Sequence, residues 1–268
     1  MVSLTISQKP IMNVIFSDSR GRDMQKQLPY THTNISHIYT YPGATLGYLT
    51  KQAIQFLHHN CTDNIHIYFI GGLCDIASKD KDLHYQEVTY METPKQTTLR
   101  LTHILQDTET QIKEAGATPC FATIAPQSLH LWNNTRLTQG KTSHLLHYKH
   151  YDDMQTLMNT AITNINRHII MLNHANNMHT PKLGETIIKP KSSSNKPRLH
   201  YTRLQPDGVH LTPNLATTWN KITTHTIDIN RTTTTPTLPT LNTHTSEDSD
   251  TDEDRDLERG RPWLPARE

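Results

Sequence analysis

Short apolar runs alternate along the chain with stretches of helical periodicity, and this alternation limits the possible folds more than any other feature. The apolar runs cover residues 11–16, 35–41, 65–70 and 119–124. Apolar residues recur at three- and four-residue spacing in residues 46–57, 101–115, 154–172 and 215–229. Strands that alternate with helices at these lengths form right-handed βαβ units, with helices on both faces of a parallel sheet. We therefore predict a three-layer α/β sandwich with a central parallel sheet of about five strands.

The character of the sequence changes near Arg231. The residues that follow show no apolar periodicity and few large apolar side chains, which is typical of disordered segments. We predict one folded domain over residues 1–230 and a disordered acidic tail over residues 231–268. Residues 246–268 hold nine Asp and Glu and four Arg, a net charge of −5, whereas the rest of the chain has a net charge of +6. This mildly basic body permits weak contact with a nucleic acid without requiring it.

The sequence shows neither a membrane span nor an export signal. No run approaches the roughly 18 apolar residues that mark a transmembrane helix, and residues 1–10 lack the charged and then apolar pattern of a signal peptide. The three cysteines, Cys61, Cys74 and Cys120, form no CxxC pair, which is typical of a reducing compartment. We expect an intracellular protein, in the cytoplasm or the nucleus.

A first candidate for chemistry follows the first apolar run, in the sequence Ser17-Asp18-Ser19. This position puts the Ser19 hydroxyl at the carboxyl edge of the sheet, where open α/β sheets bind ligands. If a helix begins there, its free N–H groups point at the same place and suit an oxyanion formed by a nucleophile. The alternative is a Ser/Asp helix cap without catalytic use.

A second candidate is the pair Asp207 and His210, three residues apart on a turn that enters the last predicted helix. A carboxylate in this position can hold the imidazole in one tautomer and leave its other nitrogen for a serine. The alternative is a capping Asp beside an exposed His.

Two glycine turns form the third candidate. Gly43 lies in residues 41–45, after the second apolar run, and residues 71–75, Gly-Gly-Leu-Cys-Asp, follow the third. Either turn can present a backbone N–H to a ligand, and for both the alternative is ordinary turn chemistry.

In chain order the four blocks are Ser17-Asp18-Ser19, the Gly43 turn, residues 71–75 and the pair Asp207 and His210. Taken together and in that order, they resemble the SGNH (GDSL-type) hydrolase superfamily over about residues 11–228. The resemblance implies an SGNH/flavodoxin-like fold and the hydrolysis of a small acyl-ester or lipid-like substrate, with no metal or organic cofactor. It implies Ser19 as nucleophile, His210 as general base and Asp207 as the group that orients His210. The oxyanion hole would comprise the N–H groups of Ser19 and Gly43, with Cys74 at the third position.

Two residues depart from the pattern of this superfamily. Ser17 stands where Gly is usual, and Cys74 stands where an Asn usually supplies the third oxyanion donor. Because a thiol is a weak donor, we expect a serine esterase with a weakened oxyanion hole. Asp75, the next residue, is expected to brace the glycine turn.

The block at residues 71–75 and the acidic end also look like the SGNH-type domains of eukaryotic retroelements. This likeness leaves a second function open. The chain is then a catalytically impaired binding module of a mobile-element protein, which contacts nucleic acid or lipid.

Weaker signals have ordinary alternatives. Arg20 and Arg22 favour an anionic substrate or are surface charges. Cys74 is itself a nucleophile or a small buried residue. His144, His147 and His150 share a metal or form a solvated helix end. The basic segment 189–198 contacts phosphates or is a solvated loop, and it contains no aromatic residue on which bases would stack.

Overall fold

The structure is a computed structural model, and it describes residues 10–27, 34–60, 64–79, 88–90, 92–140, 148–188 and 201–233. The chain divides into two compact units, residues 1–235 and 236–268. The second unit lies outside the described residues, as does most of the predicted tail, so the boundary near residue 230 stays a prediction. The last described helix ends at Thr233.

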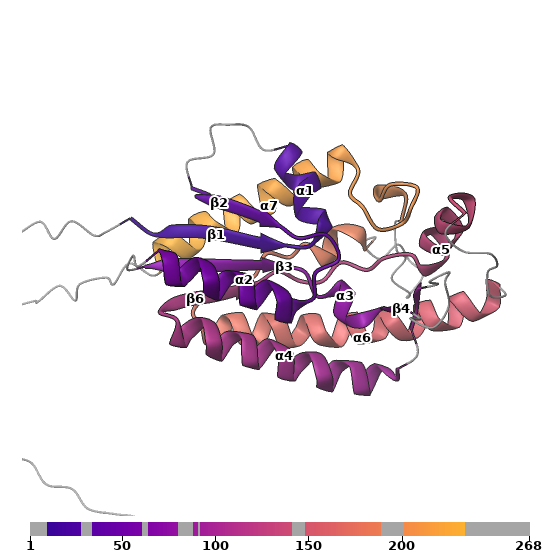
Figure 1. The fold of residues 1–268 in the computed structure, drawn as a ribbon, viewed down its shortest axis with the longest axis horizontal. Helices are drawn as coiled ribbons and strands as arrows, with labels where there is room; N and C mark the ends of the chain where they lie inside the picture. The colour runs from indigo at the N-terminus through magenta and orange to yellow at the C-terminus, as the bar shows by residue number, and fades with distance from the viewer. Residues whose placement is uncertain are drawn as a thin grey trace, which may run out of the picture. The chain divides into compact units, whose positions relative to one another are not determined.

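A parallel sheet forms the centre of the first unit, and its strands come from the four apolar runs (Figure 1). In spatial order they are β2 (His37–Thr40), β1 (Met12–Ser17), β3 (Ile65–Ile70) and β6 (Ala117–Phe121). All three pairings are parallel. Every residue of β3 is buried, as expected for a strand covered on both faces.

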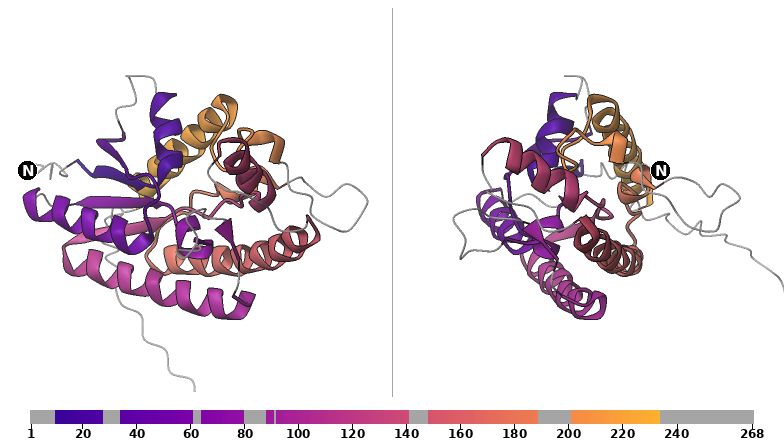
Figure 2. Two further views of the ribbon diagram at one scale, coloured as in Figure 1. Left: turned by 45° about the vertical axis from the view of Figure 1, so that its right-hand side comes forward. Right: turned by 90° about the vertical axis from the view of Figure 1, so that its right-hand side faces the viewer.

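Seven helices are described, and five of them cover the sheet. In chain order the helices are α1 (Ser19–Lys26), α2 (Leu46–His59), α3 (Leu73–Ile76), α4 (Pro94–Glu114), α5 (Leu129–Thr138), α6 (Tyr148–Ala175) and α7 (Pro213–Thr233). Figure 2 shows α2, α4 and α6 on one face of the sheet and α1 and α7 on the other.

The two faces of the sheet build two separate cores. Successive strand side chains point to opposite faces, so Val14 and Phe16 of β1 join α2, α4 and α6, whereas Ile15 joins Met24 of α1 and Trp219 of α7. The predicted three-layer α/β sandwich is thereby confirmed. None of the described helices is long and apolar enough to cross a membrane.

The described sheet has four strands instead of the predicted number of about five. Residues 178–187 run beside β6, where a further strand would pair, but they do not form a ladder. The Asn173 amide on α6 already satisfies both backbone groups of Phe121, accepting from its N–H at 2.9 Å and donating to its carbonyl at 2.7 Å. Pro181, which accepts from the N–H of Thr123, has no N–H to return. The edge of the sheet is therefore closed by a side chain rather than by another strand.

Two mostly polar segments between the main elements contain short elements. Residues 126–150 include α5, and residues 76–95 include the antiparallel pair β4 (Ser78–Lys79) and β5 (Val88–Thr89). Helix α5 buries only Leu129 and Asn133, so no apolar stripe marks it in the sequence. Two 3₁₀ turns, Gly184–Ile187 and Tyr201–Arg203, complete the described elements.

Candidate active site

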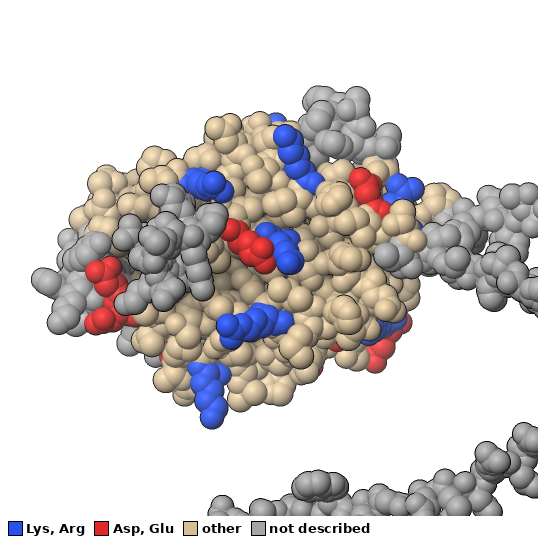
Figure 3. All heavy atoms as spheres, turned by 180° about the vertical axis from the view of Figure 1, so that it is seen from behind, with Lys and Arg blue, Asp and Glu red and all other residues tan. Residues whose placement is uncertain are grey.

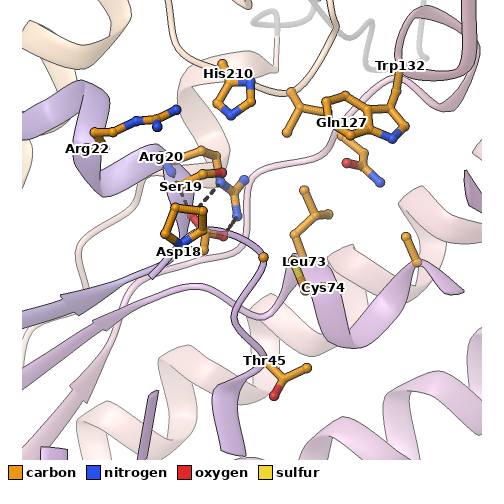
Figure 4. A pocket seen from close by; sticks show the side chains of 14 residues that line it. Asp18, Ser19, Arg20, Arg22, Thr45, Leu73, Cys74, Gln127, Trp132 and His210 are labelled. Atoms are coloured by element: carbon orange, nitrogen blue, oxygen red, sulfur yellow. Dashed lines mark hydrogen bonds and ion pairs between the residues drawn. The ribbon is translucent and has the colours of Figure 1, made fainter. Parts of the chain in front are cut away.

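A cavity of about 760 Å³ lies where β1, β2 and β3 end (Figure 4). This is the carboxyl edge of the sheet, the usual ligand site of open α/β folds. The lining combines polar and apolar residues: Asp18, Ser19, Arg20, Arg22, Pro42, Gly43, Thr45, Leu73, Cys74, Ala77, Gln127, Trp132, Val209 and His210. Four of the five predicted site residues, Ser19, Gly43, Cys74 and His210, therefore line one cavity. The fifth, Asp207, does not line it but is hydrogen-bonded to His210.

Ser19 is the first residue of α1, directly after the turn from β1. The Asp18 carboxylate caps this helix by accepting from the N–H of Arg20 at 2.9 Å. Gly21 permits the close approach of the turn, because a Cβ there would lie 2.4 Å from the Cβ of Ser17. The helix N-terminus thus brings Ser19 to the cavity, and Asp18 accepts from the next two N–H groups, those of Arg20 and Gly21.

The serine at position 17, where the superfamily that the sequence resembles usually has glycine, has a structural explanation. Ser17 is the last residue of β1, it is fully buried, and its hydroxyl donates to the carbonyl oxygen of Ile70 on β3 at 2.9 Å. Among the described non-glycine residues, only Asn64 and Asn177 have positive φ. Serine is tolerated here because the backbone does not need the left-handed conformation that favours glycine.

Asp207 and His210 form a hydrogen-bonded pair on the turn before α7. The Asp207 Oδ2 and the His210 Nδ1 are 2.5 Å apart. The other carboxylate oxygen accepts from the backbone N–H groups of Val209 and His210, at 2.9 and 3.0 Å. These three contacts hold the carboxylate and the ring in a fixed relation, and among the described residues no hydrogen bond engages His210 Nε2.

The pKa values of this pair move in opposite directions. Burial alone would raise the pKa of Asp207, but the hydrogen bonds from His210 and from the two backbone N–H groups outweigh it and lower the pKa. The hydrogen bond to Asp207 raises the pKa of His210, although burial opposes that change. Both shifts stabilise an imidazolium beside a carboxylate.

Gly43 lies in a tight turn between β2 and α2. The N–H of Ala44 donates to the carbonyl of Tyr41 at 3.1 Å, Pro42 is the second residue of the turn, and Gly43 is the third with φ +74°. This is the arrangement of a type II turn, in which the third position favours glycine. Within the described part of the chain, neither the Gly43 N–H nor the Ser19 N–H donates to a protein acceptor.

Cys74 reaches the cavity from the short helix α3. The turn before α3 needs Gly72, which has φ +96° and whose Cβ would lie 2.8 Å from Ile124. The Cys74 side chain is exposed at the cavity, so the alternative expectation of a small buried residue is wrong. Cys74 thus lines the same cavity as Ser19 and Gly43, from a third element of the chain.

Trp132 and Gln127 also line the cavity, and neither was predicted from the sequence. Trp132 lies on α5, with its ring centroid 6.2 Å from that of His210. Trp132 and Gln127 lie together on the side of the cavity opposite Arg22 in Figure 4. The one signal in the sequence was a tryptophan inside the mostly polar segment 126–150.

The predicted residues differ in how closely they approach one another. Asp207 and His210 are in contact, but among the described residues no hydrogen bond joins Ser19 to His210. Catalytic hydrogen bonds are often long without substrate and shorten in the complex. No group of three His, Cys, Asp or Glu side chains suited to a metal lies in the described residues. His144, His147, the His150 side chain, the basic segment 189–198 and the acidic tail lie outside them.

Comparison with known proteins identifies the fold. Neither a family model nor a curated protein matches the sequence. The parallel sheet with its helices is nevertheless the α/β fold of solved acylhydrolase and lipase structures. A candidate acylhydrolase from Bacteroides fragilis is similar with a TM-score of 0.51 and 12% identity, over 84% of this chain and 88% of its own.

A second structure has the same degree of similarity. A GDSL-like lipase from Bacteroides thetaiotaomicron has a TM-score of 0.51 and 11% identity, over 84% of this chain and 92% of its own. At this identity the likeness establishes a shared fold, which agrees with the fold implied by the four sequence blocks.

Proposed function

We propose that the protein is a serine hydrolase of SGNH type that cleaves ester bonds at the Ser19 hydroxyl. The observation that carries the proposal is the Asp207–His210 pair at the edge of the cavity that Ser19 also lines. A carboxylate that orients an imidazole beside a serine is the arrangement that activates a hydroxyl for acyl transfer. The fold shared with a GDSL-like lipase supports the same chemistry.

In the proposed reaction the Ser19 oxygen attacks the ester carbonyl while His210 Nε2 takes the hydroxyl proton. Asp207 holds Nδ1 and stabilises the imidazolium that forms. The tetrahedral intermediate then collapses, the bond to the alcohol breaks, and His210 returns the proton to the leaving oxygen. Water attacks the acyl-serine in the same way, which releases the acid and restores Ser19.

The negative charge of the intermediate requires hydrogen-bond donors. The proposed oxyanion hole uses the N–H groups of Ser19 and Gly43, with the Cys74 thiol at the third position. Loss of one good donor costs about 10²–10³ in rate, so we expect slow turnover. The substrate class is a small acyl ester or a lipid-like ester.

Labelling with a fluorophosphonate tests this proposal directly. We expect the wild-type protein to be labelled, and Ser19→Ala and His210→Ala to lose the label, because both the nucleophile and its base are needed. Ser36→Ala removes an exposed serine elsewhere and should keep the label. A folded wild-type protein that takes no label would refute the hydrolase proposal.

The alternative is a binding module with the same fold. The likeness to retroelement domains, and with it contact with nucleic acid or lipid, stays a prediction from residues 71–75 and the acidic end. On the face shown in Figure 3, described Lys and Arg side chains are scattered among Asp and Glu rather than gathered in one patch, which favours the hydrolase. A location in the cytoplasm or nucleus also stays a prediction.

A further inference from the structure

The cavity holds two arginine side chains that differ in their partners. Its described lining holds one carboxylate, on Asp18, and two guanidinium groups, on Arg20 and Arg22, apart from the imidazole of His210. A second carboxylate, on Asp207, lies just behind that imidazole and is hydrogen-bonded to it. Whether either arginine is left to bind a ligand therefore depends on how each is bonded.

Arg20 is occupied by the protein itself. Its guanidinium forms an ion pair with Asp18 at 2.9 Å, with both side chains 3% exposed. It also donates to the Ala125 carbonyl at 3.1 Å and stacks 5.7 Å from the centre of the Trp219 ring. These contacts neutralise Arg20 and hold it in the core between α1 and α7.

Arg22 is exposed, and no hydrogen bond or ion pair within the described residues engages it. It lies three residues after Ser19 on α1, a spacing that puts two side chains on one helix face with Cβ atoms about 5–6 Å apart. In Figure 4 its guanidinium extends toward His210 along the side of the cavity that Ser19 occupies. The guanidinium that no described side chain engages is therefore that of Arg22, beside the proposed nucleophile.

The walls away from Arg22 are largely apolar. Leu73, Ala77, Trp132 and Val209 contribute apolar surface, and Gln127 contributes an uncharged amide. A ligand that fills such a cavity has an apolar body and one anionic group.

We propose that Arg22 determines substrate specificity by binding a negatively charged group, a carboxylate or a phosphate, of the ester that Ser19 attacks. This inference rests on the proposed function. A guanidinium binds either anion through two parallel N–H groups, so the two share one recognition chemistry.

Three matched acetate esters test the proposal: 4-acetoxybenzoate, 4-acetoxyphenyl phosphate and the neutral 4-acetoxybenzamide. We expect the wild-type protein to have a higher kcat/KM for at least one anionic ester than for the neutral ester. Arg22→Met should reduce that ratio about ten- to hundredfold, as loss of a charge-assisted hydrogen bond does, chiefly through KM. Arg22→Lys should retain part of the preference.

Lys26→Met is the matched control. It removes an exposed cation from the end of the same helix, away from the cavity, and should leave the ratio unchanged. An Arg22→Met ratio equal to that of Lys26→Met would overturn the proposal. The comparison of carboxylate with phosphate shows which anion the site prefers.

Direct binding separates this inference from the proposed hydrolysis. If the wild-type protein neither turns over an ester nor takes the fluorophosphonate label, the hydrolase proposal fails. Calorimetry of the same three esters with Ser19→Ala protein then decides the role of Arg22. Tighter binding of an anionic ester, lost on adding Arg22→Met, would support an anion-binding Arg22, whereas equal binding of all three would overturn it.

Discussion

The carboxylate of Asp75 accepts a hydrogen bond from the backbone N–H of Leu46 at 2.8 Å. Asp75 follows Cys74 on α3, and Leu46 begins α2 just after the Gly43 turn. Arg100 on α4 donates to the Asp75 carbonyl oxygen, also at 2.8 Å. Asp75 thus joins the two glycine turns of the cavity, and it braces more than the one turn that the sequence suggested.

Removal of the Asp75 carboxylate should destabilise the protein. Asp75→Ala leaves the N–H of Leu46 without its acceptor, which should lower the free energy of unfolding by about 1–3 kcal/mol. Asp75→Asn keeps an oxygen acceptor and should lose less. Urea denaturation measures both, with the exposed Asp107→Ala as a control that should stay within about 0.5 kcal/mol of wild type. Equal stability of Asp75→Ala and wild type would refute this role.

The pH dependence of esterase activity should report the state of His210. A general base must be neutral, and the Asp207 hydrogen bond raises the pKa of His210, so activity should rise with pH through a value above 6.5. Asp23 adds to this rise in pKa, while burial and Arg22 oppose it, and the Trp132 ring lies beside the imidazole.

Asp207→Asn should therefore move this rise in activity to lower pH. It should also reduce kcat by up to about 10⁴-fold, the effect of the same change in the serine protease triad. Profiles of kcat/KM against pH, recorded for the wild-type protein and for Asp207→Asn, measure this shift. An unchanged midpoint in Asp207→Asn would show that the carboxylate does not control the base.

Replacement of Cys74 should change the rate of hydrolysis. Cys74→Asn introduces an amide donor at the third position of the proposed oxyanion hole, and we expect kcat to rise about 10- to 100-fold, part of what one such donor contributes elsewhere. Cys74→Ala removes the thiol without adding a donor and serves as the matched control. If the asparagine variant is no faster than the alanine variant, Cys74 does not occupy an oxyanion-donor position.

Stability should fall at acid pH because of His66. This residue is 4% exposed in β3, and burial lowers its pKa to about 4. The unfolded chain binds the proton near pH 6.5, so the free energy of unfolding should fall as pH drops from about 6.5 to 4, by at most roughly 3 kcal/mol.

The variant His66→Phe should flatten this part of the stability curve. His58→Phe, which replaces an exposed histidine on α2, should leave the slope as in wild type. Urea denaturation at a series of pH values gives both slopes. A wild-type slope retained in His66→Phe would assign the acid sensitivity to other groups.

Much of the fold followed from local patterns. The four strands came from apolar runs and the long helices from apolar residues at three- and four-residue spacing, because each element must bury one side. Helix α5 and the missing further strand could not be predicted in this way. The first has no apolar stripe, and the second depends on Asn173, which lies 52 residues from its partner Phe121.

The order of Ser19, Gly43, Cys74, Asp207 and His210 was visible in the sequence, and so was their position at strand ends or helix starts. Parallel strands bring such positions to one edge, so the sequence by itself determined that Ser19, Gly43 and Cys74 lie at the same edge of the sheet. Only the tertiary structure decided what each charge near them does. Arg20 and Arg22 look alike in sequence, but Asp18 and the Trp219 ring hold one in the core while the other stays exposed at the cavity. The reason is physical: burial and pairing depend on groups from distant parts of the chain, which no local pattern contains.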